Sequence, residues 1–174
     1  FTPLTLDADA GALAVAVVLH DGGVLADWAR RVEPGAPCAI SGPGRGYTID
    51  ATAPRFVLAG DESAIPAIGQ LLETIPPSAS VLVHVEVAEP EGRVPLPAHP
   101  RAHVEWHDLT DRRDPGVTLV AAVRAVELEP TDRIWVAGEA ASVQRIRRYL
   151  FEERSFPRAQ ATVRGYWKRG RTGE

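Results

Sequence analysis

Two glycine turns, each directly after a run of apolar residues, are the positions in this sequence best suited to hold a ligand. Gly60-Asp61-Glu62 follows the apolar residues 56–59, and Gly138-Glu139 follows the apolar residues 134–137. A buried parallel strand that ends in glycine and leads into a helix brings backbone N–H groups to the carboxyl edge of a sheet. Nucleotides bind at such edges in open α/β sheets. We therefore expect both turns to contact a nucleotide.

The spacing of the histidines argues against a metal site. His103, Glu105 and His107 alternate along one predicted strand, so the two histidines lie about 13 Å apart, too far for ligands about 2.1 Å from one ion. His84 lies in an apolar strand and is expected to be a hydrogen-bonded core histidine. Cys38 has no neighbouring base, and no Gly-x-Ser-x-Gly motif is present. We therefore expect no metal and name no catalytic residue, which suits a protein whose chemistry belongs to a cofactor.

An alternation of strands and helices must position the two turns. The apolar runs predict strands at 55–60, 80–87, 102–108, 133–138 and 161–167, and helices at 63–74, at about 117–127 and from 139 to about 153. This alternation predicts an α/β fold with a five-stranded parallel sheet of order 3-2-1-4-5, from about residue 54 to 168. The first and fourth strands are neighbours at the switch point of such a sheet, so the two turns would line one crevice.

The first 50 residues follow another pattern and are predicted to form a separate β-rich part. The pattern indicates strands at 13–20 and 36–41 and a helix at 24–31. Glycines 42, 44 and 46 are predicted to form a turn, because no amphipathic helix follows them as a dinucleotide fingerprint requires. The chain has no methionine and begins with residues typical of a mid-strand segment, which indicates a piece of a longer protein.

The composition is that of an ordinary globular protein. The 174 residues are 45% hydrophobic and 24% charged. No apolar run approaches the ~20 residues that span a bilayer and no signal peptide opens the chain, so we expect a cytoplasmic protein without membrane insertion. A single cysteine excludes disulfide scaffolds, four-cysteine zinc sites and iron–sulfur clusters.

The net charge of −4 hides an uneven distribution. Residues 141–174 hold nine basic and three acidic side chains, whereas residues 1–140 hold ten basic and twenty acidic ones. The basic end is either a solvated helix face and tail or a site for an anionic ligand. Nucleic acid is a poor candidate, because the acidic body would repel a long polyanion.

Several motifs resemble one known family. GDESAIPAI (60–68), WVAGEAASVQRIRRYL (135–150) and GYWKRG (165–170) resemble the C-terminal half of siderophore-interacting proteins, which are FAD-dependent ferric-siderophore reductases related to ferredoxin reductases. VLHDGGVLADWARRVEPG (18–35) and GPGRG (42–46) resemble the last part of that family's flavin-binding barrel.

The resemblance implies a domain organisation and a function. Residues 1–50 would be the C-terminal remnant of the FAD-binding β-barrel, and residues 51–174 would form a domain like the NAD(P)-binding domain of ferredoxin reductases. The full-length protein would be a cytoplasmic monomer that uses NADH or NADPH, through FAD, to release iron as Fe(II) from imported ferric siderophores. The FAD site is incomplete, because only Phe1-Thr2 correspond to the end of the family's flavin motif, so we expect the chain alone to be inactive.

The resemblance also implies site residues. The cofactor-binding candidates are Thr2, His20, Trp28, Gly60, Asp61, Glu62, Gly138, Glu139, Tyr166 and Trp167. Lys168 and Arg169 are the siderophore-binding candidates, because many ferric siderophores carry negative charge and planar aromatic groups. The nucleotide preference stays open, since Glu86 or Glu89 could hold a ribose hydroxyl and Arg93 a 2′-phosphate.

Two alternatives remain open from the sequence. One is a non-catalytic nucleotide- or siderophore-binding domain that keeps the fold without cofactor use. The other is a flavin reductase unrelated to iron, which would share the fold but would not need the basic end.

Overall fold

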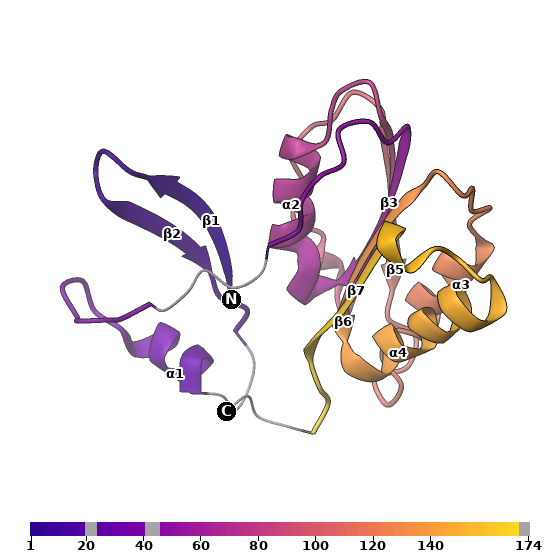
Figure 1. The fold of residues 1–174 in the computed structure, drawn as a ribbon. Coiled ribbons are helices and arrows are strands. Elements are labelled where there is room, and N and C mark those ends of the chain that lie inside the picture. The colour runs from indigo at the N-terminus through magenta and orange to yellow at the C-terminus, as the bar shows by residue number, and fades with distance from the viewer. Residues whose placement is uncertain (20–23, 41–45, 171–174) are drawn as a thin grey trace. The chain divides into compact units, whose positions relative to one another are not determined.

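The computed structural model describes residues 1–19, 24–40 and 46–170 (Figure 1). The chain divides into two compact units, one formed by residues 1–48 together with Gly170 and the other by residues 49–169. Among the described residues, no helix combines the length and the hydropathy that crossing a bilayer requires.

The first unit contains a hairpin and a short helix. Strands β1 (Thr2–Asp7) and β2 (Ala12–Ala16) pair antiparallel, and the predicted helix is confirmed as α1 (Val24–Arg31). The predicted strand at 13–20 is confirmed only up to Ala16. His20 and most of the glycine turn at 42–46 lie outside the described residues.

The prediction of a strand at 36–41 is wrong over its described residues, 36–40, which form no regular element. Pro37 cannot donate to a sheet ladder because proline has no backbone N–H. Gly35 has φ of 90°, which turns the chain immediately before the segment. The apolar residues of this segment therefore predicted a strand, but the backbone does not form one.

The second unit is the predicted α/β domain. Its strands are β3 (Arg55–Asp61), β4 (Ser80–Val87), β5 (Ala102–Asp108), β6 (Arg133–Glu139) and β7 (Ala161–Trp167). Its helices are α2 (Ile65–Thr74), α3 (Val117–Ala125) and α4 (Ala140–Arg148), with short helical turns η1 (Glu62–Ala64), η2 (Pro90–Gly92), η3 (Tyr149–Glu153) and η4 (Arg158–Gln160). All five strands are parallel in the order β5-β4-β3-β6-β7, which confirms the predicted order 3-2-1-4-5.

The two central strands, β3 and β6, are buried on both faces of the sheet. Helix α2 covers one face, and helices α3 and α4 cover the other (Figure 1). Val57 and Ala59 of β3 belong to the core cluster that includes Leu119 of α3 and Ile146 of α4. Phe56, completely buried, points to the opposite face because side chains alternate along a strand. Burial on both faces explains why these strands appear in the sequence as unbroken apolar runs.

The helix after β6 has the predicted extent but a different last turn. Helix α4 ends at Arg148, and the chain continues as the π-helical turn η3 to Glu153. The backbone N–H of Arg154 donates to the carbonyl of Tyr149, five residues before it, at 2.9 Å. Ser155, two residues after this wider turn, has φ of 50°.

A buried ion pair joins the amino ends of β3 and β6. The guanidinium of Arg55 donates to Asp132 through Nε (2.9 Å) and Nη2 (2.5 Å). Asp132 is 1% exposed, and its Oδ2 also accepts from the backbone N–H of Glu129 at 2.8 Å. The Asp132 carboxylate stabilises the fold because each of its hydrogen bonds is made. Removing one partner would leave the other partner buried without a hydrogen bond, which costs stability.

We expect Asp132→Asn to lower the free energy of unfolding by about 2 kcal/mol, because one acceptor and the buried charge are lost while Arg55 stays in place. Chemical denaturation measures this. The matched control is Asp108→Asn, since Asp108 pairs with Arg93 at the surface and should change stability by less than about 0.5 kcal/mol. Equal losses in the two variants would contradict the assigned role of Asp132.

Candidate functional site

The carboxylate of Asp61 joins the carboxyl ends of three strands. Its Oδ1 accepts from the backbone N–H and the hydroxyl of Ser63, at 3.0 and 2.5 Å. Its Oδ2 accepts from the backbone N–H of Glu139 at 2.7 Å and from the indole Nε1 of Trp167 at 2.8 Å. The ends of β3, β6 and β7 therefore meet at one anionic group, and the two glycine turns lie side by side as predicted.

Gly60 and Gly138 allow this close approach. A Cβ on Gly60 would lie 2.4 Å from the Cβ of Ala64 and 2.7 Å from the carbonyl oxygen of Ala137. A Cβ on Gly138, whose φ is 152°, would lie 2.6 Å from Oδ2 of Asp61. Both glycines are thus required by the packing of the two turns against each other, whether or not a ligand binds there.

Glu139 occupies the amino end of α4. Its Oε2 accepts from the backbone N–H groups of Ala141 (2.6 Å) and Ser142 (2.9 Å), and its Oε1 accepts from the backbone N–H of Arg169 at 3.4 Å. This arrangement differs from the expectation that the turns offer free N–H groups to a phosphate. The Glu139 carboxylate already accepts hydrogen bonds from the first N–H groups of α4 and offsets the positive end of the helix dipole, which is what an N-cap side chain does.

Glu62 and Glu86 also use their carboxylates inside the protein. Glu62 Oε1 accepts from the backbone N–H of Ala88 at 2.8 Å. Glu86, 3% exposed, accepts from the backbone N–H groups of Gly116 (2.6 Å) and Leu119 (3.0 Å) at the start of α3. Burial raises the pKa of Glu86, although these hydrogen bonds oppose the shift. The hypothesis that Glu86 holds a ribose hydroxyl is therefore wrong, because both of its oxygens are already engaged.

The other two candidates for nucleotide preference are exposed. The carboxylate of Glu89 pairs with Arg112, and the guanidinium of Arg93 pairs with Asp108. Surface ion pairs of this kind contribute little to stability, so either group could exchange its partner for a ligand at little cost. Glu89 and Arg93 therefore stay candidates for a ribose hydroxyl and a 2′-phosphate.

The end of β7 carries aromatic and basic residues, of which Trp167 contacts the Asp61 carboxylate. Trp167 and Tyr166 are 42% and 43% exposed, and the Tyr166 ring lies edge-on to Trp135 with 6.2 Å between the ring centres. Lys168 is exposed. The guanidinium of Arg169 donates to the carbonyl of Arg113, so this side chain already has a partner within the chain.

Part of the basic end is used by the fold itself. Arg145 pairs with Asp114 at 2.9 Å and donates to the carbonyl of Pro115 at 3.0 Å, which ties α4 to the segment before α3. The guanidinium of Arg158 lies 4.5 Å from the centre of the Phe151 ring. Some of the basic side chains in residues 141–174 therefore have partners within the fold, so the excess of positive charge does not by itself indicate a ligand.

The flavin candidates belong to the first unit. Thr2 is half-buried on β1, and Trp28 is 40% exposed on α1. His20 is outside the described residues. Trp28 lines a shallow hollow with Val24, Arg31 and other residues of the same segment.

The distance between His103 and His107 along β5 excludes only a metal site built from that one strand. In the parallel pair of β4 and β5, Glu105 lies directly opposite His84, and His107 lies one pleat further along. Strands are about 4.8 Å apart, so these side chains meet across the ladder. His84 is buried and hydrogen bonded as expected, but its partner is His107, at 3.0 Å. The register of the two strands was the missing information.

We expect Gly138→Ala to lower the free energy of unfolding by about 2–4 kcal/mol, because the new methyl group would displace the Asp61 carboxylate and strain the backbone. Urea denaturation measures the loss. Gly46→Ala is the control, since a Cβ there meets open space. A Gly138→Ala protein as stable as the control would refute the close packing of the two turns.

The stability of Glu86→Gln relative to the wild type should depend on pH. The raised pKa of Glu86 means that the folded protein binds this proton more tightly than the unfolded chain does. The resulting stability is present below the ordinary value of 4.5 and is lost as pH rises through the folded pKa. As pH rises from 4 to 7, the Tm of the wild type should therefore fall relative to the Tm of Glu86→Gln. A wild type that gains stability relative to the variant as pH rises would contradict the sign.

Comparison with known proteins places this geometry in a family. The model of the siderophore-interacting protein family matches residues 53–170, and that of the siderophore-interacting FAD-binding domain matches residues 1–47. The ferredoxin reductase in carbazole 1,9a-dioxygenase has a similar fold, with a TM-score of 0.52 at 16% identity over 69% of this chain and 40% of that one.

Individual relatives agree with the family match. Protein Rv2895c of Mycobacterium tuberculosis, which is uncharacterised, is 38% identical over 97% of this chain and 64% of its own length. The ferric vibriobactin reductase ViuB of Vibrio cholerae is 31% identical over 96% of this chain and 63% of its own length. The crystal structure of the siderophore-interacting protein SipS from Aeromonas hydrophila matches with a TM-score of 0.82 at 25% identity, over 95% of this chain and 70% of that one. The chain belongs to the siderophore-interacting protein family.

Proposed function

We propose that the full-length protein is an NAD(P)H-dependent, FAD-containing reductase of ferric siderophores, and that residues 51–174 bind the nicotinamide nucleotide. One observation carries the proposal: two glycine turns meet at the switch point of the sheet, beside the exposed aromatic and basic end of β7. The name of ViuB, a ferric vibriobactin reductase, supports it. The chain spans 64% of Rv2895c and 63% of ViuB, so the activity is proposed for the whole protein.

The residues at the crevice suit the uncharged part of the nucleotide. Gly60 and Gly138 have no side chains, so a ring could approach the backbone closely. Asp61 and Glu139 already compensate the nearby N–H groups, and their negative charge would repel a pyrophosphate. We therefore assign the nicotinamide and its ribose to this crevice, and the phosphates to exposed cations such as Arg93.

The residues of the first unit suit one side of a flavin. Trp28 offers an exposed aromatic face, and Arg31 lines the same hollow with a positive charge. Thr2, on β1, supplies a hydroxyl. A bound FAD would supply the redox chemistry that links a two-electron hydride donor to the one-electron reduction of iron(III).

The end of β7 suits an anionic, aromatic ferric siderophore. Tyr166 and Trp167 are exposed aromatic rings, and Lys168 follows directly with an exposed ammonium group. Cations and aromatic faces together bind negatively charged, planar groups. Arg169 contributes charge, although its guanidinium also holds the carbonyl of Arg113. Lys168 is therefore the residue whose substitution tests the substrate site with least damage to the fold.

Charge reversal at Lys168 should discriminate between substrates. In the full-length protein loaded with FAD, Lys168→Glu should raise the KM for an anionic ferric siderophore roughly fivefold or more and leave turnover of a neutral iron chelate nearly unchanged. The difference should shrink with added salt, because screening shortens to about 8 Å near 0.15 M. Steady-state kinetics with NADH and NADPH measures both effects.

Arg154→Glu is the matched control, because Arg154 is also an exposed cation near the C-terminus but is distant in sequence from the aromatic end of β7. It should behave as the wild type with both substrates. Equal losses on the anionic and neutral substrates would remove Lys168 from the substrate site. A full-length protein that cannot take up flavin would refute the reductase function itself and favour a non-catalytic binding domain.

A further inference from the structure

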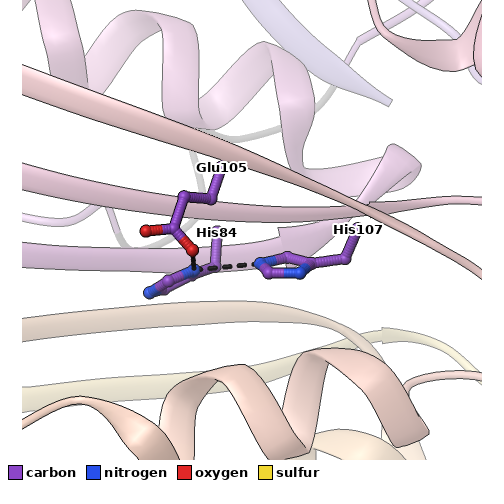
Figure 2. A group of neighbouring side chains, drawn as sticks. All are labelled: His84, Glu105 and His107. Atoms are coloured by element: carbon purple, nitrogen blue, oxygen red, sulfur yellow. Dashed lines mark hydrogen bonds and ion pairs between the residues drawn. The ribbon is translucent and has the colours of Figure 1, made fainter.

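We propose that His84, Glu105 and His107 bind one divalent transition-metal ion. The three side chains come from the neighbouring strands β4 and β5, and they point toward one another (Figure 2). His84 and Glu86 are two residues apart on β4 and therefore point to the same face of the sheet. Because Glu86 contacts the start of α3, the three side chains lie on the face that α3 covers. The proposal does not depend on the proposed reductase activity.

The distances suit the coordination of one small ion. His84 Nδ1 lies 3.0 Å from His107 Nε2 and 3.5 Å from Glu105 Oε2. Ligands about 2.1 Å from a tetrahedral ion are about 3.4 Å apart. The three ligand atoms all lie within 4.8 Å of one another, so an adjustment of roughly 1 Å in the half-buried Glu105 or His107 completes the geometry.

The same convergence is poorly explained by hydrogen bonding alone. Nδ1 of His84 faces Nε2 of His107 and a carboxylate oxygen of Glu105. If Nδ1 carries the proton, it can donate well to only one of these two atoms, and if Nε2 of His107 carries it, the lone pair of Nδ1 faces the carboxylate. A divalent cation at this point attracts all three donor atoms at once, which makes it the more favourable occupant.

A further residue holds the carboxylate in position. His103 Nε2 lies 3.2 Å from Glu105 Oε1, the oxygen that faces away from the cluster. This contact leaves Oε2 directed at His84. Metal-binding carboxylates are generally held by such hydrogen bonds, and losing them weakens metal affinity. His103 is therefore a positioning residue for the site.

The donor set selects the chemical class of the ion. Two imidazoles and one carboxylate suit Zn²⁺, Fe²⁺ or Co²⁺, whereas Mg²⁺ and Ca²⁺ prefer sites made only of oxygen. The side chain of Glu105 is 44% exposed, so water has access to the remaining coordination positions. Three protein ligands with open positions are typical of a site that exchanges a ligand, and not of a closed structural site.

Calorimetric titration of Zn²⁺ and, without oxygen, of Fe²⁺ into untagged, chelator-treated full-length protein tests the proposal. We expect saturable binding that includes one ion per chain at this cluster, with no competition from millimolar Mg²⁺. Glu105→Gln and His107→Gln should each weaken that binding tenfold or more, and His103→Gln should weaken it by a smaller factor. Co²⁺ should give visible absorption that these variants lose.

His99→Gln is the matched control, since His99 contacts the carbonyl of Pro76 and not the cluster. Glu105 lies on an edge strand and is half exposed, so Glu105→Gln should remain folded, which circular dichroism checks. Zn²⁺ binding that Glu105→Gln and His107→Gln leave unchanged would overturn the proposal. The absence of saturable binding in the wild type would overturn it too, and so would equal affinity for Mg²⁺, leaving the cluster as a hydrogen-bonded histidine pair.

Discussion

The Asp61 carboxylate is the group around which the carboxyl edge of the sheet is organised. It accepts hydrogen bonds from Ser63, Glu139 and Trp167, which belong to the ends of three different strands or the turns after them. A half-buried anion needs this many donors, because each one replaces water that the fold excludes. Its hydrogen bonds tie the carboxyl ends of β6 and β7 to that of β3, and it leaves no room for a side chain at residue 138.

Carboxylates repeat this function along the same edge. Glu139 holds the start of α4, Glu86 the start of α3 and Glu62 the end of β4. The helix ends that usually attract a phosphate are therefore neutralised from within the chain. This supports the proposed division of the edge, in which the acidic turns bind hydroxyl and amide groups of a nucleotide and the exposed cations bind its phosphates and an anionic substrate.

The sheet could be predicted from the sequence because each central strand is an unbroken apolar run between turn residues, and because parallel strands with helical crossovers permit few orders. The strand predicted at 36–41 does not form, because Pro37 has no N–H for a sheet ladder and Gly35 turns the chain just before it, effects that outweigh the apolar composition of the segment. The role of Glu86 could not be predicted, because its partners Gly116 and Leu119 are 30 and 33 residues away. The approach of His84 to His107 depends on strand register, which local patterns do not contain.

Amide hydrogen exchange of the full-length protein with and without NADH or NADPH tests the central claim most directly, because it reports where the nucleotide binds without requiring turnover. Binding between the two glycine turns should slow exchange in both segments 60–64 and 137–142, while the remote segment at 76–80 stays unchanged. Protection of neither turn at saturating nucleotide, or protection confined to residues outside β3, β6 and β7, would contradict the assignment of the nicotinamide to this crevice.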